Sequence, residues 1–358
     1  MAKDPFFSSR LLKWHKTHNN REMPWKGEKD PYKIWLSEII LQQTRVDQGL
    51  AYYNRFVKAF PTIQLLAKSS EKKVLKLWEG LGYYSRCRNL IHTAKHISKT
   101  YKGKFPDDFE SVSQLKGIGP YTASAICSFA FNQPYAVLDG NVFRVISRVF
   151  GITTPIDSTA GKKFFTKLAN ELLSKEEPAL YNQAIMDLGA TICKPKQPLC
   201  EQCPLAANCE ARLHDAVSFL PVKGKKLQRR KRFLNYVIAV YGNGFYVRER
   251  KEKDIWQNLH EFILMETDKP LAVTGLQKKL SAWMATSMKT SAFVIEDISP
   301  TIQQELTHQV ISGKFITVRL TRELPAALGY RRISKSGLRK MAFPKFIRQH
   351  LATSGMLD

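Results

Sequence analysis

Apolar residues recur at helical spacing through roughly the first 215 residues of the chain. Asp30-Pro31 has the form of a helix cap followed by proline at the first helical position, and apolar residues keep the helical period from Ile34 to Val46. Stretches around Trp78 and Leu168 continue the same period, and glycines and prolines separate them. This pattern predicts that the first part of the chain is mainly helical.

The pattern changes after Phe219. Residues 219–232 are basic and have no apolar period, which is typical of a linker. Beyond them, apolar runs on either side of Gly242-Asn243-Gly244 predict a hairpin, and residues 311–318 suggest another. Residues 278–284 and 343–351 have helical spacing. We therefore expect a helical domain over residues 1–217, a basic linker over 218–232 and a smaller α+β domain over 233–358.

The charge of the chain indicates a polyanionic partner. The 358 residues include 56 Lys and Arg against 31 Asp and Glu, a net charge of +25. Seven of these cations fall within residues 223–232 without an acid among them. Nucleic acid is the first interpretation of such a balance, and a merely soluble basic protein is the alternative.

No stretch approaches the ~20 apolar residues of a membrane span, and the N-terminus has no signal-peptide pattern. We expect a cytoplasmic protein, associated with the nucleoid in a bacterium, that has no membrane partner.

Four of the six cysteines are clustered. Cys193, Cys200, Cys203 and Cys209 have six, two and five residues between them. In a reducing compartment such a cluster indicates a metal site rather than disulfides, and four thiolates suit either zinc or an iron–sulfur cube. Zinc sites usually have two short pairs, whereas only one pair is short here. Cys87 and Cys127 stand alone in apolar helical patterns, where we expect small core residues.

A tight turn between two helical patterns offers a phosphate site. Gly117-Ile118-Gly119 follows a helix predicted near residues 109–115 and precedes one that begins near Tyr121. Gly117 and Gly119 allow a tight turn, and backbone N–H groups at the start of the second helix can bind a phosphate oxygen. A lone Gly-x-Gly is a weak signal, because any helix–helix turn can carry it.

Two carboxylates are candidates for chemistry. Asp139 precedes the helical run 142–150 and has the position of an N-cap, the ordinary role of aspartate there. Facing a flipped nucleotide, it could also stabilise a cationic sugar, with Asn141 holding the sugar or the backbone beside it. Glu38 is surrounded by apolar neighbours. It is either a solvated residue on an outer helix face or a general acid whose pKa burial has raised.

These motifs together resemble a known family. The six-two-five cysteine spacing resembles the [4Fe–4S] loop of the endonuclease-III and MutY-type glycosylases, and the hairpin followed by Asp139 resembles the signature of the helix-hairpin-helix glycosylase superfamily. Residues 37–44 and 138–142 resemble the catalytic-helix and aspartate motifs of the MutY-type adenine DNA glycosylases. The resemblance implies a helix-hairpin-helix glycosylase domain with an iron–sulfur loop at 193–209, followed by a Nudix-like α+β domain.

The resemblance also implies a reaction. Adenine opposite 8-oxoguanine or guanine in duplex DNA is flipped out, Glu38 protonates its N7, and Asp139 stabilises the oxocarbenium until water completes hydrolysis. Tyr121 stands where the endonuclease-III branch carries its Schiff-base lysine, so a lyase step should be absent or weak. Tyr121 is then expected to position the aspartate and the sugar, in an enzyme that acts as a monomer.

Recognition residues are implied in the same way. By resemblance, Tyr83 is a wedge into the base stack and Gln42 is a second inserted residue or reads a base edge. Arg21 and Trp25 belong to the adenine pocket, where Gln183 hydrogen-bonds the base. In the C-terminal domain Thr307 and His308 match two positions of a Phe-Ser-His loop that the family places against the oxidised guanine, with Leu306 in place of phenylalanine. That domain resembles a Nudix fold, but it lacks the Nudix hydrolase box, so diphosphate hydrolysis is not expected.

Two rival interpretations remain. A bifunctional pyrimidine glycosylase/lyase would need a lysine near position 121. A non-enzymatic DNA-binding iron–sulfur protein would be indifferent to the loss of Glu38 and Asp139.

Overall fold

The computed structural model describes residues 5–224 and 228–356. They form two compact units. The first unit runs from Pro5 to Lys68 and from Asn89 to Gly224, and the second contains Ser69–Arg88 and the described residues from 228 onward. No helix in the described part is both long enough and apolar enough to cross a membrane.

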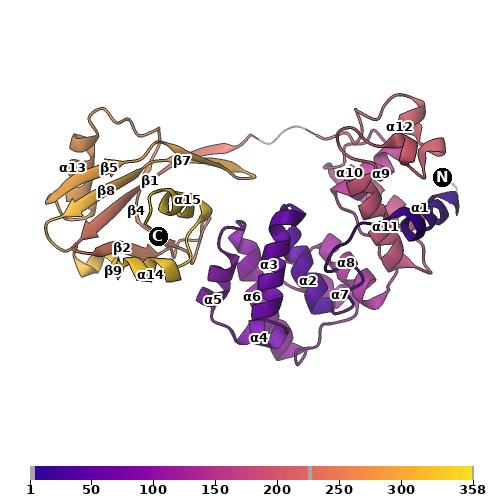
Figure 1. Ribbon diagram of the computed structural model, residues 1–358, viewed down its shortest axis with the longest axis horizontal. Helices are drawn as coiled ribbons and strands as arrows, with labels where there is room; N and C mark the ends of the chain where they lie inside the picture. Colours follow the sequence, from indigo (N-terminus) through magenta and orange to yellow (C-terminus); the bar gives the residue numbers. More distant parts are fainter. Residues whose placement is uncertain (1–4, 225–227, 357–358) are drawn as a thin grey trace. The chain divides into compact units, whose positions relative to one another are not determined.

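The first unit is helical (Figure 1). Its helices, with α6 passing into it from the second unit, are α1 (Pro5–His18), α2 (Pro31–Leu41), α3 (Val46–Ala59), α4 (Ile63–Lys68), α6 (Tyr84–Thr100), α7 (Phe109–Gln114), α8 (Pro120–Phe131), α9 (Gly140–Val149), α10 (Thr159–Leu172), α11 (Pro178–Thr191) and α12 (Glu210–Leu213). Two 3₁₀ turns, η1 (Cys200–Gln202) and η2 (Ala206–Asn208), precede α12. The helical prediction for this part of the chain is therefore confirmed.

Helix starts in this unit follow local sequence. Asp30 caps α2 by accepting a hydrogen bond from the Tyr32 N–H, and Pro31 occupies the first helical position, as predicted. One core joins α1, α9, α10 and α11 through buried residues such as Phe7, Ile146 and Phe165. Cys87 and Cys127 are both fully buried, as expected for core residues.

The second unit is built around a mixed sheet of nine strands in its described residues. The strands are β1 (Arg230–Tyr241), β2 (Gly244–Glu249), β3 (His260–Glu261), β4 (Ile263–Thr267), β5 (Phe293–Ile298), β6 (Ile302–Glu305), β7 (Gln309–Gly313), β8 (Phe315–Leu320) and β9 (Arg331–Ser334). The long strand β1 forms antiparallel ladders with β2 and β4 and parallel ladders with β7 and β8. The predicted hairpin through Gly242-Asn243 is the turn between β1 and β2.

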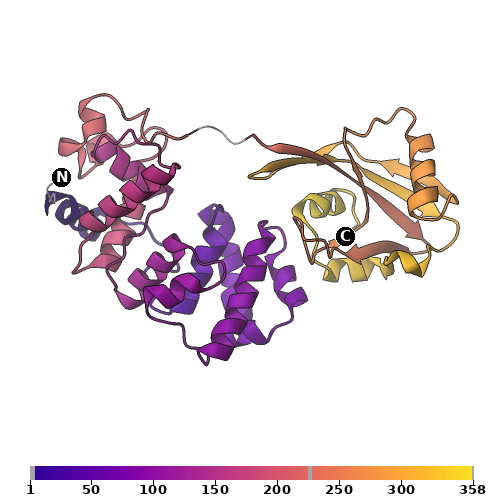
Figure 2. The ribbon, with the colours of Figure 1, turned by 180° about the vertical axis from the view of Figure 1, so that it is seen from behind.

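Helices cover both faces of this sheet (Figure 1, Figure 2). The helices of this unit are α5 (Glu71–Trp78), α13 (Leu276–Ser287), α14 (Lys335–Lys340) and α15 (Lys345–Thr353), with a 3₁₀ turn η3 (Ala326–Leu328). Because successive strand residues face opposite sides, Val237 packs in the core beside α13, whereas Tyr236 contacts Phe346 of α15. The predicted α+β architecture is confirmed, and its arrangement is consistent with a Nudix-like domain.

The hairpin expected within residues 311–318 is wrong. β7 and β8 do not pair with each other but follow one another along β1. The break between them lies at Gly313, where a Cβ atom would stand 1.8 Å from the Leu234 carbonyl oxygen. The side chain of Asn235 fills the gap in the ladder by accepting a hydrogen bond from the Lys314 N–H. Gly313 therefore looks like a turn residue in the sequence, but it is required by the close approach of two backbones at a kink.

The domain boundaries differ from those expected at two places. Residues 69–88, expected in the helical domain, pack with the C-terminal unit. The predicted linker 218–232 is also shorter, since the Val222 carbonyl accepts a hydrogen bond from Ile156 N–H of the first unit and β1 already begins at Arg230. Part of that linker, residues 225–227, lies outside the described residues.

Candidate active site

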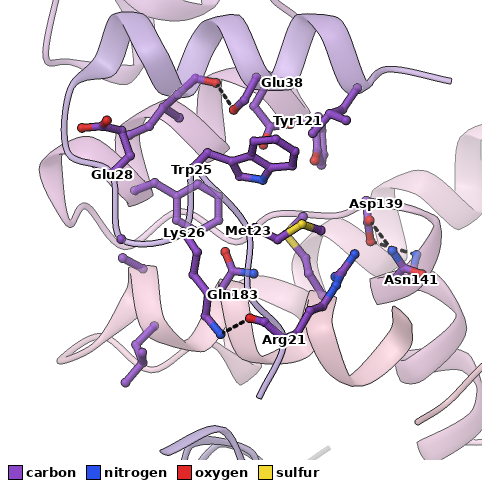
Figure 3. Close-up of a pocket in the computed structure, with 18 of the residues that line it drawn as sticks. Arg21, Met23, Trp25, Lys26, Glu28, Glu38, Tyr121, Asp139, Asn141 and Gln183 are labelled. Carbon is purple, nitrogen blue, oxygen red and sulfur yellow. Dashed lines mark hydrogen bonds between the residues drawn. The ribbon is translucent and has the colours of Figure 1, made fainter. Parts of the chain in front are cut away.

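A cavity of about 830 Å³ in the first unit gathers residues from α2, α8, α9, α11 and the segment before α2. Eight residues singled out in the sequence line it: Arg21, Trp25, Glu38, Gln42, Tyr121, Asp139, Asn141 and Gln183. Figure 3 shows Trp25 in the middle of this space, with Glu38 and Tyr121 on one side and Asp139 and Asn141 on another. The fold thus brings together residues that are up to 162 positions apart in the chain, from 21 to 183.

Glu38 lies in the last turn of α2, where its neighbours Ser37 and Ile39 are buried. The Tyr121 hydroxyl donates a hydrogen bond to its carboxylate. Burial raises the pKa of Glu38 to about 7. The hydrogen bond from Tyr121 lowers this pKa by less than burial raises it, and the Asp139 carboxylate adds a smaller increase. A carboxylic acid with that pKa holds its proton in a large fraction of molecules near neutral pH.

Asp139 is the N-cap of α9. Its Oδ1 accepts hydrogen bonds from the N–H groups of Asn141 and Val142, both at 2.8 Å, and its Oδ2 accepts one from Asn141 Nδ2 at 2.9 Å. Burial raises the pKa of Asp139, although these three bonds act in the opposite direction. The capping interpretation is therefore correct, and it does not compete with a catalytic one, because the carboxylate also lines the cavity.

The approach to Asp139 is fixed by α11. The Asn182 amide accepts a hydrogen bond from the Val137 N–H at 3.0 Å and donates one to the Tyr135 carbonyl at 2.8 Å, which holds the extended residues before the cap. Two turns further along α11, a Cβ atom at Gly189 would stand 2.6 Å from the Cβ of Asn141. Glycine at this position is what lets the start of α9 approach α11 so closely.

Arg144, one turn into α9, ties the same cap to the cysteine loop. It donates hydrogen bonds to the Asn141 Oδ1 at 2.8 Å and to the Cys193 carbonyl at 2.7 Å. Arg148, a turn further, donates to the Cys193 Sγ at 3.4 Å and to the Lys194 carbonyl at 2.8 Å.

All four clustered cysteines line one small cavity between α9 and the loop after α11. Within residues 5–224 and 228–356, no three His, Cys, Asp or Glu side chains are grouped so that they could hold a single metal ion. Burial, with a smaller contribution from the neighbouring thiols, raises the pKa of Cys203 to about 11, so this thiol would ionise only beside a strong positive charge. Four soft sulfur donors spaced around a shared cavity suit a multi-iron cluster better than one zinc ion.

The helix-hairpin-helix turn is formed by α7, α8 and residues 115–119. Gly117 has a φ of +83°, in the left-handed region, and a Cβ there would stand 2.7 Å from the Cβ of Asn89. Gly119 is the N-cap of α8 without a side-chain cap, and nothing lies within 4 Å of the position a Cβ would take. The start of α8 is thus open for a phosphate group to approach its N–H groups.

The remaining predicted residues lie in the second unit. Tyr83 leaves a tight turn in which Gly80, Gly82 and Tyr83 itself all have positive φ, and 41% of its surface is exposed. Its hydroxyl lies 2.9 Å from the hydroxyl of Thr307. His308 is exposed beside Thr307. The structure therefore brings Tyr83 and Thr307 together although 224 residues separate them.

Asn258, just before β3, stands where the resemblance to a Nudix fold implies a glycine. It has a φ of +66°, a region that asparagine tolerates better than most residues do, and its amide donates to Glu71 Oε1 at 2.6 Å. The backbone conformation explains why glycine suits this position and why asparagine can replace it.

Sequence reasoning missed Asp187, which is fully buried and bonded to Arg21 and Asn19 near the cavity. A charge inside the apolar run 184–188 was its only signal.

Comparisons with known proteins identify similar sequences and folds. The family of "HhH-GPD superfamily base excision DNA repair protein" matches residues 36–171. The chain is 34% identical over 275 residues to the adenine DNA glycosylase of Buchnera aphidicola subsp. Acyrthosiphon pisum, covering 77% of this chain and 79% of that relative. It is 41% identical over 215 residues to the Homo sapiens adenine DNA glycosylase, covering 58% of this chain and 39% of that relative.

Among solved structures, a thermostable thymine-DNA glycosylase matches with a TM-score of 0.54 at 28% identity, covering 58% of this chain and 95% of that structure. Endonuclease III trapped as a covalent intermediate with DNA matches with a TM-score of 0.51 at 19% identity, covering 59% and 95% of the two chains, and shares the fold.

Proposed function

Because this chain belongs to the adenine DNA glycosylase family, we propose that it removes adenine mispaired with 8-oxoguanine, or less readily with guanine, from duplex DNA. The reaction is hydrolysis of the N-glycosidic bond, and it leaves an apurinic site for base excision repair. The observation that carries this proposal is the pairing of Glu38 with Asp139 on one cavity, with burial setting the pKa of Glu38 to about 7.

The first step is departure of the base. Glu38 gives its proton to adenine N7 as the bond between C1′ and N9 breaks, and the electron pair of that bond leaves with the neutral purine. A general acid is most effective when its pKa lies near the working pH, which is the condition that burial creates for Glu38. Trp25 and Met23 offer apolar surface to the purine, and Gln183 and Arg21 offer donors and acceptors to its edge (Figure 3).

The second step is hydrolysis of the sugar cation. The Asp139 carboxylate stabilises the positive charge at C1′, and Asn141 holds both that carboxylate and the sugar. Water then bonds to C1′ and its proton passes to a carboxylate of the site. Tyr121 offers a phenol rather than an amine, so the enzyme is monofunctional and forms no Schiff base.

The second unit supplies recognition. Tyr83 enters the base stack, and Thr307 and His308 contact the oxidised guanine, while Gln42 contacts the opened duplex from the first unit. The hydrogen bond between the hydroxyls of Tyr83 and Thr307 supports a shared role for these residues. Phosphates bind at Gly117 and Gly119, and the net charge of +25 makes DNA binding salt-dependent.

Cys193, Cys200, Cys203 and Cys209 would hold a [4Fe–4S] cluster. When bound, the cluster would supply structural stability and would fix the loop at 193–209, because all four cysteines would serve as its ligands. Iron and acid-labile sulfide measured on protein purified without oxygen test this assignment, with the Cys200→Ser variant as the control for loss of a ligand.

Single-turnover excision on four duplexes tests the function. The duplexes carry adenine opposite 8-oxoguanine, guanine or thymine, and thymine glycol opposite adenine, and each product is resolved with and without alkali. Strand cleavage that depends on alkali, fastest for adenine opposite 8-oxoguanine and absent for adenine opposite thymine, is the expected result.

Other outcomes point elsewhere. Nicking at thymine glycol without alkali would move the chain to the lyase branch. Normal binding with no cleavage of any duplex by cluster-loaded protein would favour a binding-only role.

A further inference from the structure

A buried carboxylate beside the cavity has no part in the chemistry above. Asp187 lies on α11, one turn after Gln183, and its side chain has no exposed surface. Its Oδ1 accepts a hydrogen bond from Arg21 Nη1 at 2.8 Å. Its Oδ2 accepts one from Asn19 Nδ2 at 2.7 Å and lies 3.6 Å from Lys26 Nζ. Both carboxylate oxygens are therefore occupied by donors from the segment between α1 and α2.

That segment has no regular secondary structure of its own. Residues 19–30 are turns and irregular chain, and they carry Met23 and Trp25 into the cavity. Lys26 Nζ also donates to the Arg21 carbonyl at 2.9 Å, so Arg21 and Lys26 are tied to each other as well as to Asp187. Residues 19–30 form one wall of the cavity, and neither a helix nor strand pairing holds them in place. The side-chain bonds to Asp187 therefore determine where Trp25 lies.

The charge of Asp187 also bears on the pocket. Arg21 and Lys26 both line the cavity, and about a quarter of each side chain is exposed, 25% and 26%. His15 of α1, which contacts Asn19, adds no charge at neutral pH, because burial and the Lys26 cation lower its pKa. Without Asp187, two partly buried cations would face a base that is receiving a proton, beside a sugar that is becoming positive, which is unfavourable.

We propose that Asp187 is a positioning residue of the base pocket, which holds Arg21 and Lys26, and through them the wall bearing Met23 and Trp25, so that the purine aligns with Glu38. This inference rests on the proposed adenine excision. Asp187 touches no substrate; it acts through the cations that do.

Asp187→Asn tests the inference, because it keeps the size of the side chain and removes its charge. Two quantities are measured: the single-turnover rate on adenine opposite 8-oxoguanine, and binding to the same duplex with a tetrahydrofuran abasic analogue in place of the adenosine. We expect the rate to fall roughly 10- to 100-fold, since a misplacement of about 1 Å has that effect. Binding to the abasic analogue should stay within about twofold, because that duplex places no base against the displaced wall.

Matched variants separate positioning from stability. Glu171→Gln removes a carboxylate from an exposed ion pair with Lys167 on α10 and should leave both quantities unchanged. In an Arg21→Gln background, Asp187→Asn should have a smaller effect than in the wild type, because one of its partners is already neutral. If the Asp187→Asn variant alone folds poorly, the effect of removing the Asp187 charge is measured in the Arg21→Gln background instead.

Two results would overturn the inference while leaving the proposed function intact. One is an Asp187→Asn protein that excises adenine at the wild-type rate. The other is equal loss of excision and of abasic-analogue binding together with a lower melting temperature, which would assign Asp187 a purely structural role. A wild-type protein that excises no adenine would instead refute the proposed function, and this inference with it.

Discussion

At the scale of single residues, the proposed role of Glu38 depends on the free energy needed to ionise its carboxyl group. Burial raises its pKa to about 7, and the acid form is the one that can protonate adenine. The protonated form, which is the active one, is therefore present below pH 7 and is lost as the pH rises through 7. We therefore expect the single-turnover excision rate to fall by about tenfold per pH unit above pH 7.

The matched variant for this prediction is Glu38→Gln, which cannot donate a carboxylic proton. Its residual rate should lack the titration near pH 7 at every pH tested, while its binding to mispaired DNA matches the wild type. A Glu38→Gln protein that excises adenine normally would remove Glu38 from the mechanism.

Asp139 serves two purposes that one substitution can separate. Asparagine caps helices about as well as aspartate does, so Asp139→Asn should leave the free energy of unfolding within about 1 kcal/mol of the wild type. It removes the negative charge beside C1′, and we expect the excision rate to fall about 10²- to 10³-fold. Urea denaturation and single-turnover kinetics on the same preparation measure both effects. If stability and rate fell together, the cap alone would account for Asp139.

At the scale of elements, the packing of α9 on α11 places the catalytic cap. Gly189→Ala would put a Cβ atom 2.6 Å from the Cβ of Asn141, and relieving that contact moves the two helices apart. We expect a loss of about 1–3 kcal/mol in the free energy of unfolding. The excision rate should also fall, because Asn141 and Asp139 share a hydrogen bond.

Gly140→Ala is the control for this prediction. An added Cβ at Gly140 meets nothing within 4 Å, although the residue lies in the same cap. Chemical denaturation of the two variants side by side makes the comparison. Equal stability of Gly189→Ala and the wild type would show that the two helices adjust without cost.

Elements also show how far the sequence could predict this structure. Glu38, Asp139 and the hairpin glycines lie in short motifs whose meaning is local, so the sequence identified them. The kink at Gly313 depends on the Leu234 carbonyl of a different strand, and no local pattern reports such a contact. Asp187 was missed for the same reason, because its partners Asn19 and Arg21 lie 166 to 168 residues away.

At the scale of the whole molecule, the boundary between the two units does not follow the order of the chain. Residues 69–88 lie between helices of the first unit in sequence, yet they pack with the sheet unit. The Phe343 N–H donates to the buried Glu79 carboxylate at 2.9 Å, and the Phe343 carbonyl accepts from the Tyr84 hydroxyl at 3.1 Å. Arg348 of α15 also pairs with Glu79. None of these long-range contacts could be predicted from the helical period, which residues 69–88 share with the helices before and after them.

Removing the second unit therefore has a consequence beyond the loss of Thr307 and His308. A chain ending at Gly224 keeps Tyr83 in its sequence but loses the partners of Glu79 and Tyr84 that hold its turn in place. Hydrogen exchange of the full-length and shortened proteins measures this directly. We expect the amides of α5 to exchange on the order of tenfold faster or more in the shortened chain, because local opening no longer breaks those contacts.

The amides of α2, α8 and α9 provide the internal control, since their contacts lie within the first unit, and their exchange should not change. With the recognition roles proposed above, the shortened enzyme should also discriminate poorly against adenine opposite thymine, because the turn that bears Tyr83 is no longer held and Thr307 and His308 are absent. Unchanged protection of α5 would mean that the turn bearing Tyr83 is held by the first unit, and that loss of discrimination comes from Thr307 and His308 alone.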